Sequence, residues 1–122
     1  MAYAGIQSML LAYKMRKSDK EFELMQISQK LISETRDKTQ MSEDYLNAQA
    51  ELSKDDPNYA EAYEANKNEY EMKLADIAQM EEDLETQKES ANTEISFLNE
   101  AINNWQEALK TGIQKAHTYG AQ

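Results

Sequence analysis

The chain is 122 residues long, with 13 basic and 23 acidic side chains, three glycines, one proline and no cysteine. This length allows at most one domain, and a hydrophobic share of 40% with 8% aromatic residues favours a narrow apolar seam over a broad globular core. A net charge of −10 argues against nucleic acid as a partner, because phosphates would repel the chain. The lack of cysteine excludes disulfides, thiolate metal sites and a cysteine nucleophile.

The N-terminal residues 1–13 carry no positive charge ahead of their apolar side chains, and Gln7 and Ser8 interrupt the apolar run. These features are not those of a cleavable signal peptide. No window approaches the roughly 18 consecutive apolar residues that a membrane span requires. The sequence therefore predicts a protein without a membrane span that is cytoplasmic or is exported without a cleaved signal.

The first predicted element is a long helix over about residues 3–53. Steps of alternately three and four residues meet fifteen positions, of which eleven are apolar. This first seam comprises Tyr3, Ile6, Leu10, Tyr13, Lys17, Lys20, Leu24, Ile27, Leu31, Glu34, Lys38, Met41, Tyr45, Ala48 and Leu52.

Two stretches weaken the first helix. Lysines occupy the seam around residues 16–20, where Ser18 and Glu21 also fit a capping box. A short extra N-terminal helix with a hinge at residues 16–20 is therefore an alternative to one continuous helix. Residues 35–42 are rich in poor helix formers, so a bend is also expected there.

The single proline marks the turn, which we place at residues 53–57. Asp56 can cap a helix through its carboxylate, and Pro57 would then take the first helical position, where its missing N–H is no loss. Because this connection is only about four residues long, the two helices are expected to be antiparallel neighbours.

Folding back at this turn places residue i roughly opposite residue 110 − i, within several residues. Lys17 and Lys20 are then expected near Glu89 and Glu94. Polar side chains at such seam positions fix the register of a coiled coil, although long lysine side chains can also extend to solvent.

The second predicted helix covers about residues 57–118, and thirteen of its seventeen seam positions are apolar. A seven-residue repeat of this length is typical of a left-handed coiled coil. The fold prediction is an all-α, long antiparallel two-helix coiled-coil hairpin, forming one domain over residues 1–122 and packing into a helical oligomer. The second seam comprises Tyr63, Lys67, Tyr70, Leu74, Ile77, Glu81, Leu84, Lys88, Ala91, Ile95, Leu98, Ile102, Trp105, Leu109, Gly112, Ala116 and Tyr119.

The negative charge is concentrated in the second half of the chain. Residues 1–53 hold seven basic and eight acidic side chains, and residues 54–122 hold six and fifteen. The densest acidic stretch, residues 81–85, has two interpretations: a solvated helix face or a contact for a basic partner.

The sequence contains no recognisable catalytic or cofactor motif. A di-iron bundle needs Glu-x-x-His, but residue 114, three before the lone His117, is Gln114. No serine lies in a Gly-x-Ser-x-Gly elbow, and no glycine-rich phosphate loop is present. We therefore expect a protein that is not an enzyme, with no cofactor, no metal and no small-molecule substrate.

Apolar side chains beside the two seams are the candidate interaction residues. A two-helix hairpin alone would leave many of them in water, so we expect them to be buried against further helices. Trp105, on the seam itself, is expected to anchor the core or a subunit interface. The off-seam residues are Met9, Leu11, Met15, Phe22, Met25, Ile32, Leu46, Met72, Met80, Phe97 and Ile113, and the predicted interaction residues are Phe22, Met25, Ile32, Phe97, Trp105 and Ile113.

Tyrosines gather around the predicted turn at Tyr45, Tyr59, Tyr63 and Tyr70. They can pack in the seam with a solvated hydroxyl, or they can present an aromatic docking surface.

Three resemblances to known families follow from these patterns. The eight residues 56–63, Asp-Pro-Asn-Tyr-Ala-Glu-Ala-Tyr, resemble the opening of a tetratricopeptide repeat, without the 34-residue repetition. The hairpin plan is similar to that of WXG100 export substrates, whose Trp-x-Gly turn is missing because Gln106 and Glu107 follow Trp105.

The plan of the whole chain resembles needle and filament subunits of type III secretion and flagellar-type export systems. The shared features are an N-terminus without a signal, no cysteine, abundant Gln and Asn, a hairpin with a proline at its tip, and an amphipathic C-terminal helix. This resemblance implies that the two helices pack side by side and that the C-terminal helix lines an assembly.

Two functional hypotheses follow from the sequence. The first is a non-enzymatic structural protein whose hairpin self-associates, as in a subunit of a secretion-related filament or a similar assembly. The alternative is a cytoplasmic coiled-coil adaptor or chaperone that binds a partner helix, for which several off-seam methionines would supply an adaptable surface.

Overall fold

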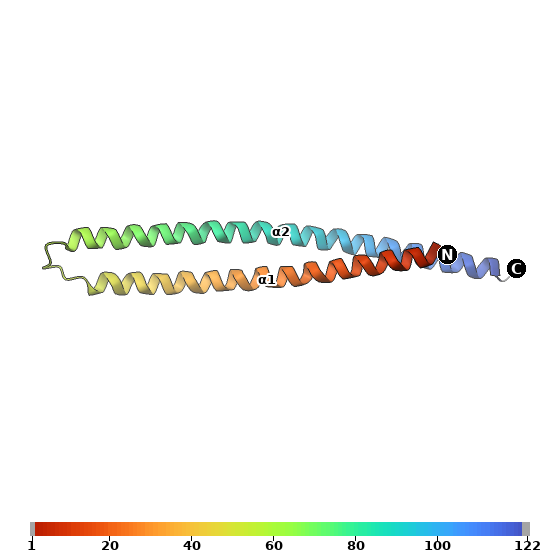
Figure 1. The fold of residues 1–122 in the computed structure, drawn as a ribbon, viewed down its shortest axis with the longest axis horizontal. Coiled ribbons are helices and arrows are strands. Elements are labelled where there is room, and N and C mark those ends of the chain that lie inside the picture. The colour runs from red at the N-terminus through yellow and green to blue at the C-terminus, as the bar shows by residue number, and fades with distance from the viewer. Residues whose placement is uncertain (1, 121–122) are drawn as a thin grey trace. The chain divides into compact units, whose positions relative to one another are not determined.

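The protein is a helical hairpin. A computed structural model describes the backbone of residues 2–120 and the side chains of residues 4–115. Helix α1 (Ala2–Glu51) and helix α2 (Tyr59–Gly120) are joined by residues 52–58, and no strand occurs in the described part of the chain (Figure 1). The predicted all-α helical hairpin is confirmed. Tyr3, Ala116, His117 and Tyr119, which the sequence analysis discussed, lie outside the residues with described side chains.

Helix α1 is continuous through both stretches where a bend or a break was considered. It is unbroken at residues 16–20, so no separate short N-terminal helix forms there. In residues 35–42, the Thr35 hydroxyl donates to the Leu31 carbonyl at 3.1 Å, and the Thr39 hydroxyl donates to the Thr35 carbonyl at 3.2 Å. These bonds to the preceding turn keep the hydroxyls compatible with helical backbone, although threonine is a poor helix former.

The connection between the helices is longer than the expected four residues, because α2 begins at Tyr59 and not at Pro57. An Asp56 carboxylate oxygen accepts the Asn58 N–H at 2.8 Å, and the Asp56 carbonyl accepts the Tyr59 N–H at 3.0 Å. The Ala62 N–H then donates to the Asn58 carbonyl at 2.9 Å. Asp56 therefore satisfies N–H groups at the start of α2, as the capping argument requires.

The hairpin divides into two compact units, each containing a segment of α1 and a segment of α2. The first unit comprises Met1–Gln26 and Lys88–Gln122, and the second comprises Ile27–Gln87. The second unit contains the connection at residues 52–58, and its yellow α1 segment runs beside its green α2 segment (Figure 1).

Each unit has its own narrow apolar core, built from seam residues. In the first unit Leu98 is fully buried. Three further seam residues of this unit are also buried: Leu10, Ala91 and Ile102. The core of the second unit consists of Ile27, Ile77 and Leu84. These are the side chains that the three-four stepping selects, because that period keeps one stripe of each helix toward its neighbour.

The seam of α1 is as predicted, whereas the seam of α2 changes phase near the connection. No described side chain of the first seam, from Ile6 in α1 to Leu52 at the start of the connection, is exposed. In α2 the same holds from Tyr70 onward, but Tyr63 and Lys67 are exposed, while Ala62 and Asn66 are half-buried. The prediction for this first part of α2 was wrong by one residue, because Ala62 and Asn66, and not Tyr63 and Lys67, are the less exposed side chains there.

Candidate interaction surface

A group of ion pairs joins the two helices of the first unit. The Lys20 ammonium lies 3.0 Å from a Glu23 carboxylate oxygen and 3.2 Å from one of Glu94, and Arg16 lies 3.6 Å from the other Glu94 oxygen. Hydrogen bonds to Glu23 and then to Glu94 raise the pKa of Lys20 above its usual value of 10.5. The expected proximity of Lys20 and Glu94 is confirmed. Lys17 instead pairs with Glu21 of its own helix, at 3.6 Å.

The second unit has one cross-helix ion pair, between Lys38 and Glu81, at 2.8 Å. Both residues occupy predicted seam positions. Glu81 opens the acidic stretch at residues 81–85, in which Leu84 is buried and Glu82, Asp83 and Glu85 are exposed. Part of this stretch therefore faces α1, and only the remaining three carboxylates form a solvated face.

Near the connection, two tyrosines and two amides hold the helices of the second unit together. The rings of Tyr45 and Tyr70 stack with centroids 4.4 Å apart and planes inclined by 8°. The Gln49 amide donates to the Tyr63 carbonyl at 3.1 Å, and its oxygen accepts from the Asn66 amide at 3.1 Å. These contacts favour the interpretation of Tyr45 and Tyr70 as packing residues and not as a docking surface.

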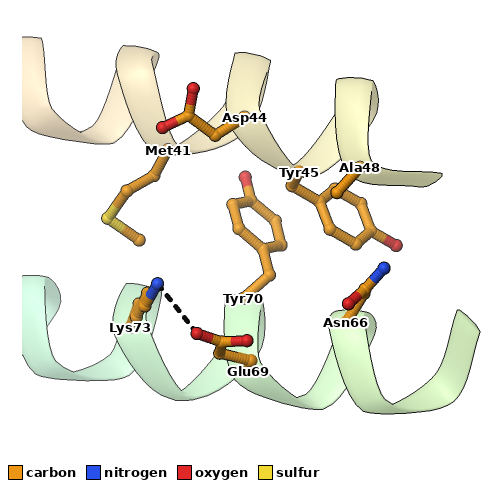
Figure 2. A pocket seen from close by; sticks show the side chains of 8 residues that line it. All are labelled: Met41, Asp44, Tyr45, Ala48, Asn66, Glu69, Tyr70 and Lys73. Carbon is orange, nitrogen blue, oxygen red and sulfur yellow. Dashed lines mark ion pairs between the residues drawn. The ribbon is translucent and has the colours of Figure 1, made fainter. Parts of the chain in front are cut away.

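A small open cavity lies beside the tyrosine stack (Figure 2). Its volume is about 180 Å³, below the roughly 300–1,000 Å³ of typical small-molecule sites. Glu69 and Lys73, both on α2, pair with each other at 3.0 Å at its edge. The cavity is a gap between the two packed helices that is open to solvent. Its lining residues are Met41, Asp44, Tyr45, Ala48, Asn66, Glu69, Tyr70 and Lys73.

The off-seam apolar side chains are exposed in the hairpin. All eleven of them keep between 41% and 69% of their surface in contact with solvent. A protein that functions as a monomer normally exposes apolar side chains singly, whereas continuous exposed apolar patches mark sites of contact with other molecules. Whether these side chains form a contact site therefore depends on whether they lie next to one another on one face of a helix.

Four of the exposed side chains lie on one face of α1 within the first unit: Leu11, Met15, Phe22 and Met25. With the exposed Ser18 between them, they are spaced alternately by four and three residues. Residues at this spacing lie above one another on a helix, so they form a continuous stripe. We call these five residues the outer α1 face.

The outer α1 face unites two of the six predicted interaction residues, Phe22 and Met25. Ile32 is also exposed on α1, but it belongs to the second unit. The individual side chains were predicted from the sequence, but the stripe that they form was not. The signal was present, because Leu11 starts a second run of three-four steps beside the first seam.

The three predicted residues on α2 do not form one patch. Phe97 and Ile113 are exposed, but sixteen residues separate them. At about 100° per residue they point roughly 160° apart around the helix. Trp105, between them, is half-buried on the seam. The exposed apolar surface of the first unit therefore points in several directions.

No protein-family model, no curated protein and no solved structure matches this chain. Within the described residues, no group of three or more histidine, cysteine or acidic side chains is placed to hold a metal ion. Neither helix, over its described length, contains a stretch long and apolar enough to cross a membrane.

Proposed function

We propose that the protein is a non-enzymatic structural subunit whose hairpin self-associates into a larger helical assembly. The observation that supports this proposal is that, among residues 4–115, eleven large apolar side chains stay at least 41% exposed after the two helices have paired. Each of them loses contact with water when another helix packs over it, which makes association favourable.

The distribution of these side chains supports an assembly over a single docking event. Phe22 and Met25 lie on the outer α1 face, while Phe97 and Ile113 lie on two further directions around α2. A subunit that contacts neighbours on several sides can build a ring or a filament. The plan of the hairpin resembles that of subunits of secretion-related filaments, so a filament of this kind is the assembly that we propose.

The test replaces Phe97 and Ile113 together by serine. Both side chains are half-exposed or more, so their loss removes little from the packing of the hairpin itself. We expect helix content by circular dichroism to stay near that of the original protein, while the assembled mass falls. Asn99→Ser with Thr111→Ser is the matched control, because both residues are exposed and polar on the same helix. Retention of the native mass by the Phe97 and Ile113 variant would contradict the proposal.

A second candidate function is an adaptor or chaperone that holds a partner helix. Within the part of the chain whose side chains are described, five methionines are exposed, and flexible thioether side chains suit surfaces that adapt to different partners. The two candidates differ in the behaviour of the pure protein, because a self-assembling subunit associates without a partner and an adaptor does not. The methionines are Met9, Met15, Met25, Met72 and Met80.

A further inference from the structure

We propose that the outer α1 face of the first unit pairs with the same face of a second copy of this chain, forming a second helix seam on a part of α1 that α2 leaves exposed. This inference rests on the proposed self-association and names the surface that starts it. The face comprises Leu11, Met15, Ser18, Phe22 and Met25, all of them exposed.

The spacing of the face is that of a coiled-coil seam. Its residues follow one another at four, three, four and three residues, as the buried seam residues of α1 do. A helix with two such stripes can pack against two neighbours at once. The first stripe is covered by α2 in the hairpin, and the second remains open.

The exposed apolar residues of α2 are an unsuitable partner for this face. They form no stripe, because consecutive members lie eight, seventeen and sixteen residues apart and not three or four. These residues are Met72, Met80, Phe97 and Ile113. A matching surface of the same period is found only on the outer α1 face itself, among the described residues. An isologous contact, with the same face on both copies, is the simplest arrangement that covers it.

The charge on this part of α1 also permits a second copy to approach. Residues 1–26 hold four basic and three acidic side chains, whereas the whole chain has a net charge of −10. The α2 segment of the same unit, residues 88–122, holds three basic and four acidic side chains, so the first unit carries little net charge. Two copies that meet through the first unit therefore avoid the repulsion that two second units, with six basic and sixteen acidic side chains each, would suffer. Lys14 and the two acids Asp19 and Glu21 flank the stripe and are exposed, so each copy offers both signs to the other.

Ser18 gives a test that does not depend on the relative direction of the two helices. It lies in the middle of the stripe, so it is covered whether the two copies run parallel or antiparallel. Ser18→Leu completes the apolar stripe, and the dissociation constant should fall on the order of tenfold or more. Ser18→Glu buries a charge on each copy, and the dissociation constant should rise by about tenfold or more.

Ser90 supplies the matched control. It is exposed, belongs to α2 of the same unit, and lies outside the stripe. Ser90→Leu and Ser90→Glu make the same chemical changes, including the change in helix propensity, without touching the outer α1 face. Sedimentation equilibrium of the full chain is measured for all four variants and for the unsubstituted protein.

The expected result is tighter association for Ser18→Leu, weaker association for Ser18→Glu, and dissociation constants within about twofold of the original for both Ser90 variants. If the protein assembles but the Ser18 and Ser90 variants behave alike, the outer α1 face is not the contact, and the proposed function stands without it. If the original protein and Ser18→Leu are both monomeric at every concentration, both proposals are wrong.

Discussion

Replacing Phe22 by serine should weaken self-association strongly while leaving the hairpin folded. The side chain keeps 57% of its surface exposed, so slightly more than half of its apolar area remains to be buried by a second copy. Full burial of a phenylalanine is worth up to about 3 kcal/mol, so covering this remainder contributes about 1.5 kcal/mol per copy. Two copies in a dimer contribute about 3 kcal/mol, which corresponds to a dissociation constant roughly 100-fold higher in the variant.

The assay is sedimentation equilibrium, with circular dichroism on the same samples. Phe22→Leu is the conservative control, because leucine keeps most of the apolar area and should stay within about tenfold of the original dissociation constant. The helix content of both variants should match that of the unsubstituted chain, since Phe22 is not a seam residue. If Phe22→Ser associates as tightly as the original, or if Phe22→Leu loses as much affinity as Phe22→Ser, burial of the Phe22 side chain does not drive association.

Two further predictions concern the hairpin itself. Leu98→Ala should lower the free energy of unfolding, measured by urea denaturation, by about 3 kcal/mol, because Leu98 is fully buried. Leu46→Ala is the control, and it should lower the free energy of unfolding by about 1 kcal/mol or less, because Leu46 is 62% exposed. Equal losses in the two variants would mean that Leu98 is not a core residue. The raised pKa of Lys20 means that the folded state holds its proton more tightly, so its contribution to stability is complete below pH 10.5 and is lost as the pH rises through the folded-state pKa. The stability difference between the original chain and Lys20→Gln should therefore be constant from about pH 7 to 9 and shrink above pH 10.5; a difference that grows with pH would contradict the assigned ion pairs.

The sequence was sufficient for the helices and for most of the seam because both depend on a local period. Leu98 and Ile102 are buried, and Leu11 and Phe22 are exposed, as their positions in the three-four stepping predict. The continuity of α1 was harder to predict, because poor helix formers at residues 35–42 favour a bend. The hydroxyl bonds of Thr35 and Thr39 to the preceding turn depend on rotamers that no pattern of residue types specifies.

The register was predicted only approximately because it depends on the geometry of the connection. The turn argument places residue 45 opposite residue 65, whereas Tyr45 stacks on Tyr70. The connection has seven residues, 52–58, and not four, since α2 begins after Pro57. A loop of this length closes in several ways, and its choice follows from contacts that form across the two helices.

Asn66 shows where a hydrophobic pattern fails. The stepping assigns Lys67 to the seam and leaves Asn66 outside, but the Asn66 amide donates to the Gln49 oxygen at 3.1 Å and is half-buried. Amide side chains can face inward when their polar atoms find partners: the Gln49 oxygen accepts from the Asn66 amide, and the Gln49 amide donates to the Tyr63 carbonyl. Such residues leave no apolar pattern in the sequence.

The proposed function requires that the pure protein associates with itself through apolar surface that the hairpin leaves open. Sedimentation velocity over a wide dilution series at physiological salt tests it most directly. We expect species heavier than the 14.0 kDa chain that dissociate on dilution. A single 14.0 kDa species at every concentration would contradict it and would leave the exposed side chains to a different partner.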